Sequence, residues 1–206
     1  MNENKPNLLK TRVKVTQSIL KLIFIVGILT LILAILFIIT LSFTSKDNFN
    51  ISKLENGWYL TYNLSKVSFL SFSVPYRIIQ PVDNSLINAK LAFLIYLLSR
   101  ILIYLSASLY GIKQIINILT STINDYSPFN KSNIKSLKKL AFLIIGFSII
   151  ADLLLDIICC LFVTRIFLID LSNISIYGIF IGFLILIISD IFEYGVYLQN
   201  ENDTLL

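Results

Sequence analysis

Apolar residues are concentrated in four long runs, which polar and charged segments separate. The first run, residues 22–43, contains no charged side chain, and the other three cover residues 88–112, 139–163 and 174–195. A helix needs about 20 predominantly apolar residues to cross the ~30 Å hydrocarbon layer of a bilayer. Each run is long enough, so the pattern predicts four transmembrane helices.

Residues 44–87, between the first two runs, have a different pattern. Apolar and polar residues alternate in two short stretches, as they do in β-strands with one covered face. The alternating apolar positions are Trp58, Leu60, Tyr62 and Leu64, followed by Leu70, Phe72 and Val74. We therefore predict an all-α integral membrane protein with four transmembrane helices and a small extracytoplasmic loop that contains a two-stranded β element. We interpret this loop as a structural cap, and the alternative is a ligand-sensing or partner-binding ectodomain.

The composition agrees with a membrane protein. Hydrophobic residues make up 56% of the chain and charged residues only 14%, a balance outside the usual range of soluble domains. Lysines precede the first run, as they precede the apolar core of a secretory signal peptide. The run is too long for such a peptide, however, and no small-residue cleavage site follows it. We expect it to be a transmembrane helix that is not cleaved.

The positive charges indicate the orientation of the chain in the membrane. The chain carries a net charge of +5, and its lysines are most frequent in segments 1–21 and 113–138. The positive-inside rule places these segments in the cytoplasm together with the acidic tail 196–206. Alternation then places the loop 44–87 and the turn 164–173 outside, with both termini cytoplasmic. Because no basic face with interleaved aromatic residues occurs, we expect no direct binding to nucleic acid.

Asp152 and Asp156 interrupt the third apolar run one helical turn apart, so both project from one face of the helix. An aspartate at the centre of a membrane helix costs about 2.5–3.5 kcal/mol and therefore needs a partner. Arg100 lies at a similar depth in the second run. We predict a buried cluster in which its guanidinium bridges the two carboxylates, helped by the hydroxyls of Tyr96 or Tyr104. We interpret the cluster as fixing helix pairing, with a switching or ion-conducting role as the alternative.

The fourth run contains a pattern that favours close helix packing. Gly178 and Gly182 have the small-xxx-small spacing that lets two helix backbones approach each other. We interpret it as intramolecular packing; the alternative is a dimerisation face, which would make the protein a homo-oligomer. Charged residues near the cytoplasmic end of this run are placed to form ion pairs, namely Asp190 and Glu193 with Lys138 or Lys139.

The sequence lacks the residue patterns of known catalytic centres. It contains no histidine, which removes the commonest general base and the preferred zinc ligand. Cys159 and Cys160 are adjacent in an apolar run, so we interpret them as small buried hydrophobic residues. Two aspartates on one helical turn also differ from the proton-sharing pair of aspartyl proteases, which comes from separate elements. We predict a non-enzymatic protein with no catalytic residues, no metal site and no cofactor.

Two stretches near the predicted cytoplasmic surface carry a family resemblance: SPFNKSNIKSLKKLAFLI at 127–144 and IFEYGVYLQNENDTLL at 191–206. They resemble the uncharacterised bacterial family called domain of unknown function 2975 (DUF2975), with its Pro-Phe-x-x-x-Asn element and its Phe-x-x-Gly-x-x-Leu-x-x-Glu-x-Asp tail. The matching positions are Pro128, Phe129, Asn133, Phe192, Gly195, Leu198, Glu201 and Asp203. The chain departs from the family where Thr204 replaces the usual leucine. The resemblance implies a four-span protein of the bacterial cell membrane and no known activity.

Members of this family often lie beside small helix-turn-helix regulators, which implies a cytoplasmic partner of that kind. Our leading hypothesis is a regulatory or accessory membrane protein that contacts a small transcription regulator through the loop 113–138 and the tail 196–206. We expect the tail to extend the fourth helix and to dock on the basic segment 131–139, with a solvated, fraying tail as the alternative. Other hypotheses are a small transporter or channel subunit that uses the buried charges and would need oligomerisation, and a membrane immunity protein.

Overall fold

Two compact units make up the fold. The computed structural model describes residues 4–64, 67–80, 87–125, 129–166 and 174–204, without the side chains of 4–10, 125 and 202–204. One unit, called here the polar-pocket unit, contains residues 1–29, 106–148 and 175–206. The other, the sheet unit, contains residues 30–105 and 149–174.

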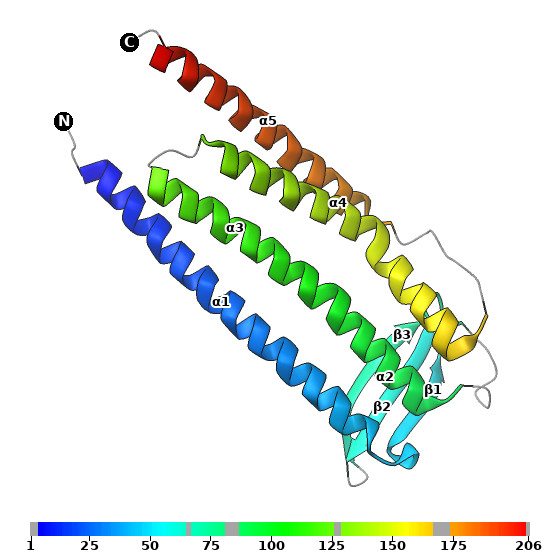
Figure 1. Cartoon of the computed structure of the whole chain (residues 1–206). Coiled ribbons are helices and arrows are strands. Elements are labelled where there is room, and N and C mark those ends of the chain that lie inside the picture. The colour runs from blue at the N-terminus through cyan, green and yellow to red at the C-terminus, as the bar shows by residue number, and fades with distance from the viewer. Residues whose placement is uncertain (1–3, 65–66, 81–86, 126–128, 167–173, 205–206) are drawn as a thin grey trace. The chain divides into compact units, whose positions relative to one another are not determined.

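Long helices account for most of the described residues (Figure 1). Two of them include a five-residue π-helical turn, a feature that shifts the helical register locally. The described helical elements are α1 (Asn4–Ser42), the short 3-10 helix η1 (Lys46–Asn48), α2 (Ala89–Arg100), the π-helical η3 (Ile101–Leu105), α3 (Ser106–Asp125), α4 (Lys131–Cys159), the π-helical η4 (Cys160–Thr164) and α5 (Ile176–Thr204). Because α2, η3 and α3 are continuous, and η4 continues α4, four of the described helices are long and apolar enough to cross a membrane.

The helices extend beyond the predicted apolar runs. The segment 113–138, predicted to be a cytoplasmic loop, is helical up to Asp125 and again from Lys131. The physical reason is that residues 113–125 contain neither proline nor glycine and keep apolar residues at helical spacing. The tail 196–206 continues α5 as far as Thr204, as expected for a helical extension.

A three-stranded antiparallel sheet belongs to the sheet unit. Its strands pair in the order β1 (Phe49–Leu54), β2 (Gly57–Leu64) and β3 (Val67–Pro75). The predicted alternation lies in β2 and β3, but the prediction of two strands is wrong because β1 adds a third. The alternation in β1 is short, since only Phe49 and Ile51 are covered even in part. A third strand helps because an isolated two-stranded hairpin is marginally stable.

An aromatic core joins the sheet to α2. The ring of Phe93 lies 5.3 Å from that of Phe49 and 4.6 Å from that of Phe72, measured between centroids. Trp58 is fully buried, and its indole Nε1 donates a hydrogen bond of 2.8 Å to the carbonyl of Ile79. Burying each large side chain contributes about 1.5–3 kcal/mol. The covered face of the sheet thus forms the core of this unit.

Lys90 connects the start of α2 to the end of α1 within the sheet unit. Its Nζ donates hydrogen bonds of 2.7 Å to the carbonyls of Ser42 and Thr44. The last carbonyls of a helix have no partners inside the helix and attract cations. The lysine therefore caps α1 at the point where the chain leaves the helix for the sheet.

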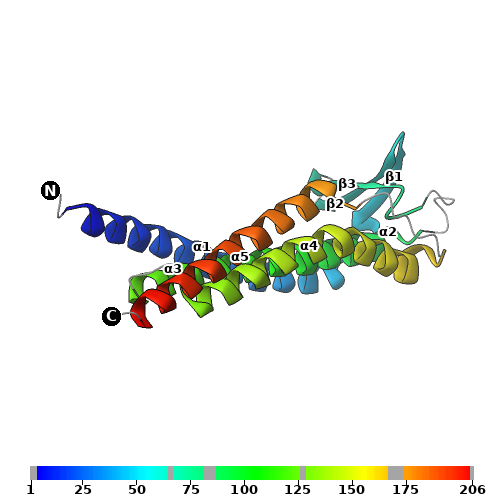
Figure 2. The same cartoon turned by 90° about the horizontal axis from the view of Figure 1, so that it is seen from above.

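The helices of the polar-pocket unit pack in the order α1, α3, α4, α5 (Figures 1 and 2). Between α1 and α3, Gln17 Nε2 donates a hydrogen bond of 2.6 Å to Thr120 Oγ1. Gly178 and Gly182 of α5 lie against α4: a Cβ at Gly178 would come within 2.9 Å of Ser148 Cβ, and one at Gly182 within 3.1 Å of the Ala141 carbonyl oxygen. These two glycines thus allow close packing inside the chain.

Candidate functional site

Four of the eight family-motif residues lie where the start of α4 packs against α5. This region is called here the α4–α5 junction and comprises Phe129, Asn133, Lys138, Phe192, Glu193 and Gly195. The rings of Phe129 and Phe192 lie 5.2 Å apart between centroids. A Cβ added to Gly195 would lie only 2.6 Å from Phe129 Cδ1, so glycine leaves room for the ring. The two halves of the motif, more than sixty positions apart in the chain, therefore form one packed contact.

Asn133 anchors the first turn of α4. Its side chain is fully buried, and its Nδ2 donates a hydrogen bond of 3.2 Å to Thr122 Oγ1 at the end of α3. Its backbone N–H donates to Asn130 Oδ1 at 2.7 Å, so Asn130 caps the helix. Asn130 in turn donates to Ser121 Oγ at 2.7 Å. These bonds tie the beginning of α4 to α3, and the side chain of Asn133 contributes the bond to Thr122.

An ion pair crosses the junction. Lys138 Nζ lies 2.7 Å from Glu193 Oε2 and 4.0 Å from Asp190 Oδ1. Of the two lysines expected to form this contact, Lys138 makes it. All three side chains are substantially exposed, and exposed ion pairs typically stabilise by only about 0.2–1 kcal/mol. The pair therefore sets the charge of this surface more than it stabilises the fold.

The remaining motif positions lie at the end of α5 or outside the described residues. Leu198 is 41% exposed, and Glu201 accepts a hydrogen bond of 2.7 Å from the hydroxyl of Tyr197. Pro128 lies outside the described residues, and so does the side chain of Asp203. The end of α5 is thus an exposed helical surface that carries acidic residues.

The predicted charge cluster lies in the sheet unit and is arranged differently from the expectation. Asp152 accepts a hydrogen bond of 2.5 Å from the Tyr104 hydroxyl and lies 3.7 Å from the guanidinium of Arg77. Arg100 instead donates to the Tyr96 hydroxyl at 2.7 Å and forms no ion pair with an aspartate in the described parts of the chain. The prediction that Arg100 bridges the two carboxylates is therefore wrong.

The physical reason is that each group has a nearer partner. The Arg100 guanidinium lies 5.7 Å from the centre of the Tyr96 ring and 6.0 Å from that of Tyr104, within the range of a cation–π interaction. Arg77, which follows β3, was not a candidate because the sequence argument looked for partners only inside the apolar runs.

Asp156 is the buried member of the pair, only 4% exposed. It accepts a hydrogen bond of 3.5 Å from the Cys160 thiol. Both cysteines are free and buried, in keeping with their interpretation as small apolar residues. Among the described residues, no group of three or more histidine, cysteine or acidic side chains is placed to hold a metal ion.

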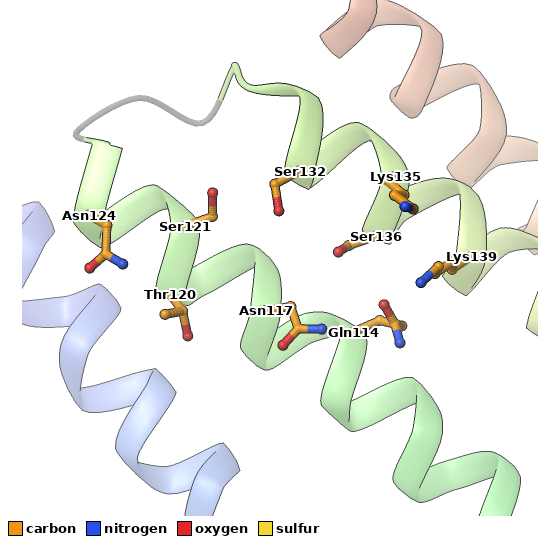
Figure 3. A pocket seen from close by; sticks show the side chains of 9 residues that line it. All are labelled: Gln114, Asn117, Thr120, Ser121, Asn124, Ser132, Lys135, Ser136 and Lys139. Atoms are coloured by element: carbon orange, nitrogen blue, oxygen red, sulfur yellow. The ribbon is translucent and has the colours of Figure 1, made fainter.

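A polar pocket lies between α3 and α4 in the polar-pocket unit (Figure 3). It has a volume of about 450 Å³, within the range of about 300–1,000 Å³ typical of ligand sites. Residues from both helices line it, including Gln114, Asn117, Ser132, Lys135, Ser136 and Lys139. The pocket was not predicted from the sequence. The available signal was the group of amides and hydroxyls in residues 114–124, which was assigned to a loop.

These features define a class: a mainly helical protein with four helices long and apolar enough to span a membrane, and a small three-stranded sheet. Residues 73–205 match the family described as "Protein of unknown function (DUF2975)". The chain belongs to this family. No curated protein and no solved structure matches the chain.

Proposed function

We propose that the chain is a non-enzymatic integral protein of the bacterial cell membrane that binds a small cytoplasmic helix-turn-helix regulator. Four helices would cross the bilayer, with both termini in the cytoplasm and the sheet outside. Exposed apolar side chains on the long helices support the insertion: Leu33 is 64% exposed, Phe142 63% and Phe180 62%. Hydrocarbon solvates such surfaces, whereas water favours their aggregation.

The charge of α5 is the single observation that carries the partner proposal. Residues 176–204 contain four acidic residues and no lysine or arginine. Lys138 contacts two of the acids at the α4–α5 junction, while Glu201 and Asp203 lie at least two helical turns further along. A regulator that binds DNA carries a basic surface. The acidic end of α5 would attract that surface and orient it.

The packing of the α4–α5 junction supports this role because it fixes the position of α5 next to its acidic end. The Phe129 ring fills the space over Gly195, and the buried Ser189 hydroxyl donates a hydrogen bond of 3.4 Å to the carbonyl of Ile134. A binding surface loses less conformational entropy when its backbone is already fixed. On this proposal, the family motif maintains a preformed acidic surface.

The test first looks for a helix-turn-helix regulator encoded beside the chain, as the family resemblance implies, and then measures its binding. The purified protein is held in neutral detergent on a biosensor surface, and binding is compared between wild type, a truncation that lacks residues 199–206, and Glu201→Lys/Asp203→Lys. We expect the truncation to abolish binding. The charge reversal should weaken binding by at least about tenfold, since it replaces attraction with repulsion at two positions. Rising salt should weaken wild-type binding.

Asp47→Lys/Glu55→Lys provides the matched control. It makes the same change of charge on exposed residues of the loop predicted to lie outside, so it should leave binding unchanged. No binding by wild type, or equal binding by wild type and Glu201→Lys/Asp203→Lys, would contradict the proposal. The transporter and immunity hypotheses stay predictions from the sequence.

A further inference from the structure

The polar pocket between α3 and α4 has the chemistry of an anion site. Lys135 and Lys139 contribute two positive charges one helical turn apart, and no acidic residue lines the pocket. From α4, Ser136 and Lys139 face Gln114 and Asn117 of α3 (Figure 3). Ammonium groups, hydroxyls and amide N–H groups can all donate hydrogen bonds to phosphate oxygens.

Two of the lining side chains are buried polar groups. Gln114 is 4% exposed and Ser136 is 6% exposed, and both line the pocket. Neither makes a side-chain hydrogen bond within the part of the chain that the structure describes. Neither residue contributes an enclosed side-chain polar atom that lacks a partner, so the Gln114 amide and the Ser136 hydroxyl are accessible from the pocket. A polar ligand in the pocket would therefore find both groups available for hydrogen bonds.

A second, mainly apolar groove lies next to the polar pocket along the same two helices. It has a volume of about 220 Å³ and is lined by residues such as Ala107, Gly111, Leu143 and Phe147. A Cβ on Gly111 would lie 3.5 Å from Leu143 Cδ2 and would therefore occupy space in the groove. The glycine leaves that space open. Neighbouring stretches of α3 and α4 thus line a polar, positively charged pocket and then a mainly apolar groove.

This change occurs at the same level on both helices. On α3 it falls between Gly111 and Gln114, and on α4 between Lys139 and Leu140. If the chain spans the membrane as proposed above, this level lies at the cytoplasmic boundary of the hydrocarbon layer. Lysines at such a boundary extend their ammonium groups toward the headgroups.

We infer that the groove between α3 and α4 binds one anionic phospholipid of the cytoplasmic leaflet. Lys135, Lys139 and the buried amide of Gln114 hold its phosphate, and an acyl chain lies along Gly111 and Leu143. The inference rests on the proposed membrane insertion but not on the proposed regulator. A soluble phosphate compound shares the headgroup chemistry, but it would leave the apolar half of the groove without a role.

Lipid retention by the purified full chain tests the inference. The protein is delipidated in neutral detergent and titrated with phosphatidylglycerol, phosphatidylcholine or inorganic phosphate, and bound ligand is counted by native mass spectrometry. We expect one phosphatidylglycerol to bind more tightly than phosphatidylcholine, and inorganic phosphate to bind weakly. Removing both charges with Lys135→Gln/Lys139→Gln should weaken phosphatidylglycerol binding about thirtyfold, given the usual contribution of a lysine at an anionic surface.

Lys131→Gln/Lys138→Gln is the matched control. Both residues lie on α4 but border the groove toward α5 and not the polar pocket, so this variant loses the same charge and should retain phosphatidylglycerol. Gly111→Leu fills the apolar groove while leaving the polar pocket intact. It should weaken binding of phosphatidylglycerol and leave binding of inorganic phosphate unchanged.

Each contrary outcome overturns the inference in a recognisable way. Equal binding of the two lipids would exclude an anion site, and equal losses in the two lysine variants would indicate an unspecific basic surface. Phosphate binding as tight as lipid binding, unaffected by Gly111→Leu, would indicate a soluble ligand. If Lys135→Gln/Lys139→Gln does not fold, two measurements still test the inference. These are the comparison of the two lipids on the wild-type protein and the binding of phosphatidylglycerol by Gly111→Leu. The lipid-binding assay contains no regulator, so a negative result would not contradict the proposed binding of a regulator.

Discussion

The partner of Asp152 can be identified by double-mutant cycles. The sequence predicts that Asp152 pairs with Arg100, whereas in the structure Asp152 contacts Tyr104 and Arg77. We would combine Asp152→Asn with Tyr104→Phe, Arg77→Gln or Arg100→Gln, and measure each single and double variant. The coupling energy of each cycle reports the direct interaction of the two side chains.

The geometry sets the expected order of the three coupling energies. A hydrogen bond to a charged group contributes about 1.5–3 kcal/mol, and the Asp152 side chain is 26% exposed, so we expect a value near the lower end for Tyr104. The Arg77 guanidinium lies 3.7 Å from the Asp152 carboxylate, and the Arg77 side chain is 42% exposed. We therefore expect a coupling energy of about 0.5 kcal/mol for Arg77, as for other exposed ion pairs. For Arg100 we expect a smaller coupling than for Tyr104, because Arg100 and Asp152 interact only through Tyr104, which contacts both.

Trp58 provides the assay. It is the only tryptophan of the chain and is fully buried in the sheet unit, which also contains Asp152. Its fluorescence during denaturant unfolding in neutral detergent therefore reports the free energy of unfolding of the relevant unit. A coupling of Arg100 to Asp152 that equals or exceeds that of Tyr104 would refute the arrangement described above.

Two further substitutions test the packing. Trp58→Phe removes the indole N–H that donates to the carbonyl of Ile79 and should lower the free energy of unfolding by about 1–3 kcal/mol. Unfolding is followed by circular dichroism, because this variant has lost the fluorophore. An unchanged free energy of unfolding would mean that the indole hydrogen bond does not stabilise the fold. Gly182→Ala places a methyl group against α4 and should destabilise the protein, whereas Gly146→Ala meets nothing within 4 Å and should be neutral or stabilising by up to about 1 kcal/mol. Equal effects of the two alanines on the melting temperature would contradict the close α4–α5 packing.

Local patterns were sufficient where a single physical constraint acts on a short segment. The thickness of a bilayer makes an uninterrupted apolar run such as 22–43 predict a long apolar helix, and the structure has one there. The alternation from Trp58 to Tyr62 predicts a strand with one covered face, and β2 buries those positions. The family motif likewise marked Phe129 and Gly195 from the sequence alone.

Tertiary structure decided which residues meet. Arg77 and Asp152 are 75 positions apart, and the polar pocket needs α3 and α4 to lie side by side before Gln114 can face Ser136. No local period encodes such contacts, because a charged or polar group pairs with whichever partner the packing brings nearest. The sequence by itself therefore determined the apolar helices, the strand alternation and the acidic charge of α5. Only the folded chain determined the partner of Asp152, the third strand and the pocket, since these depend on the free energy of packing between distant segments.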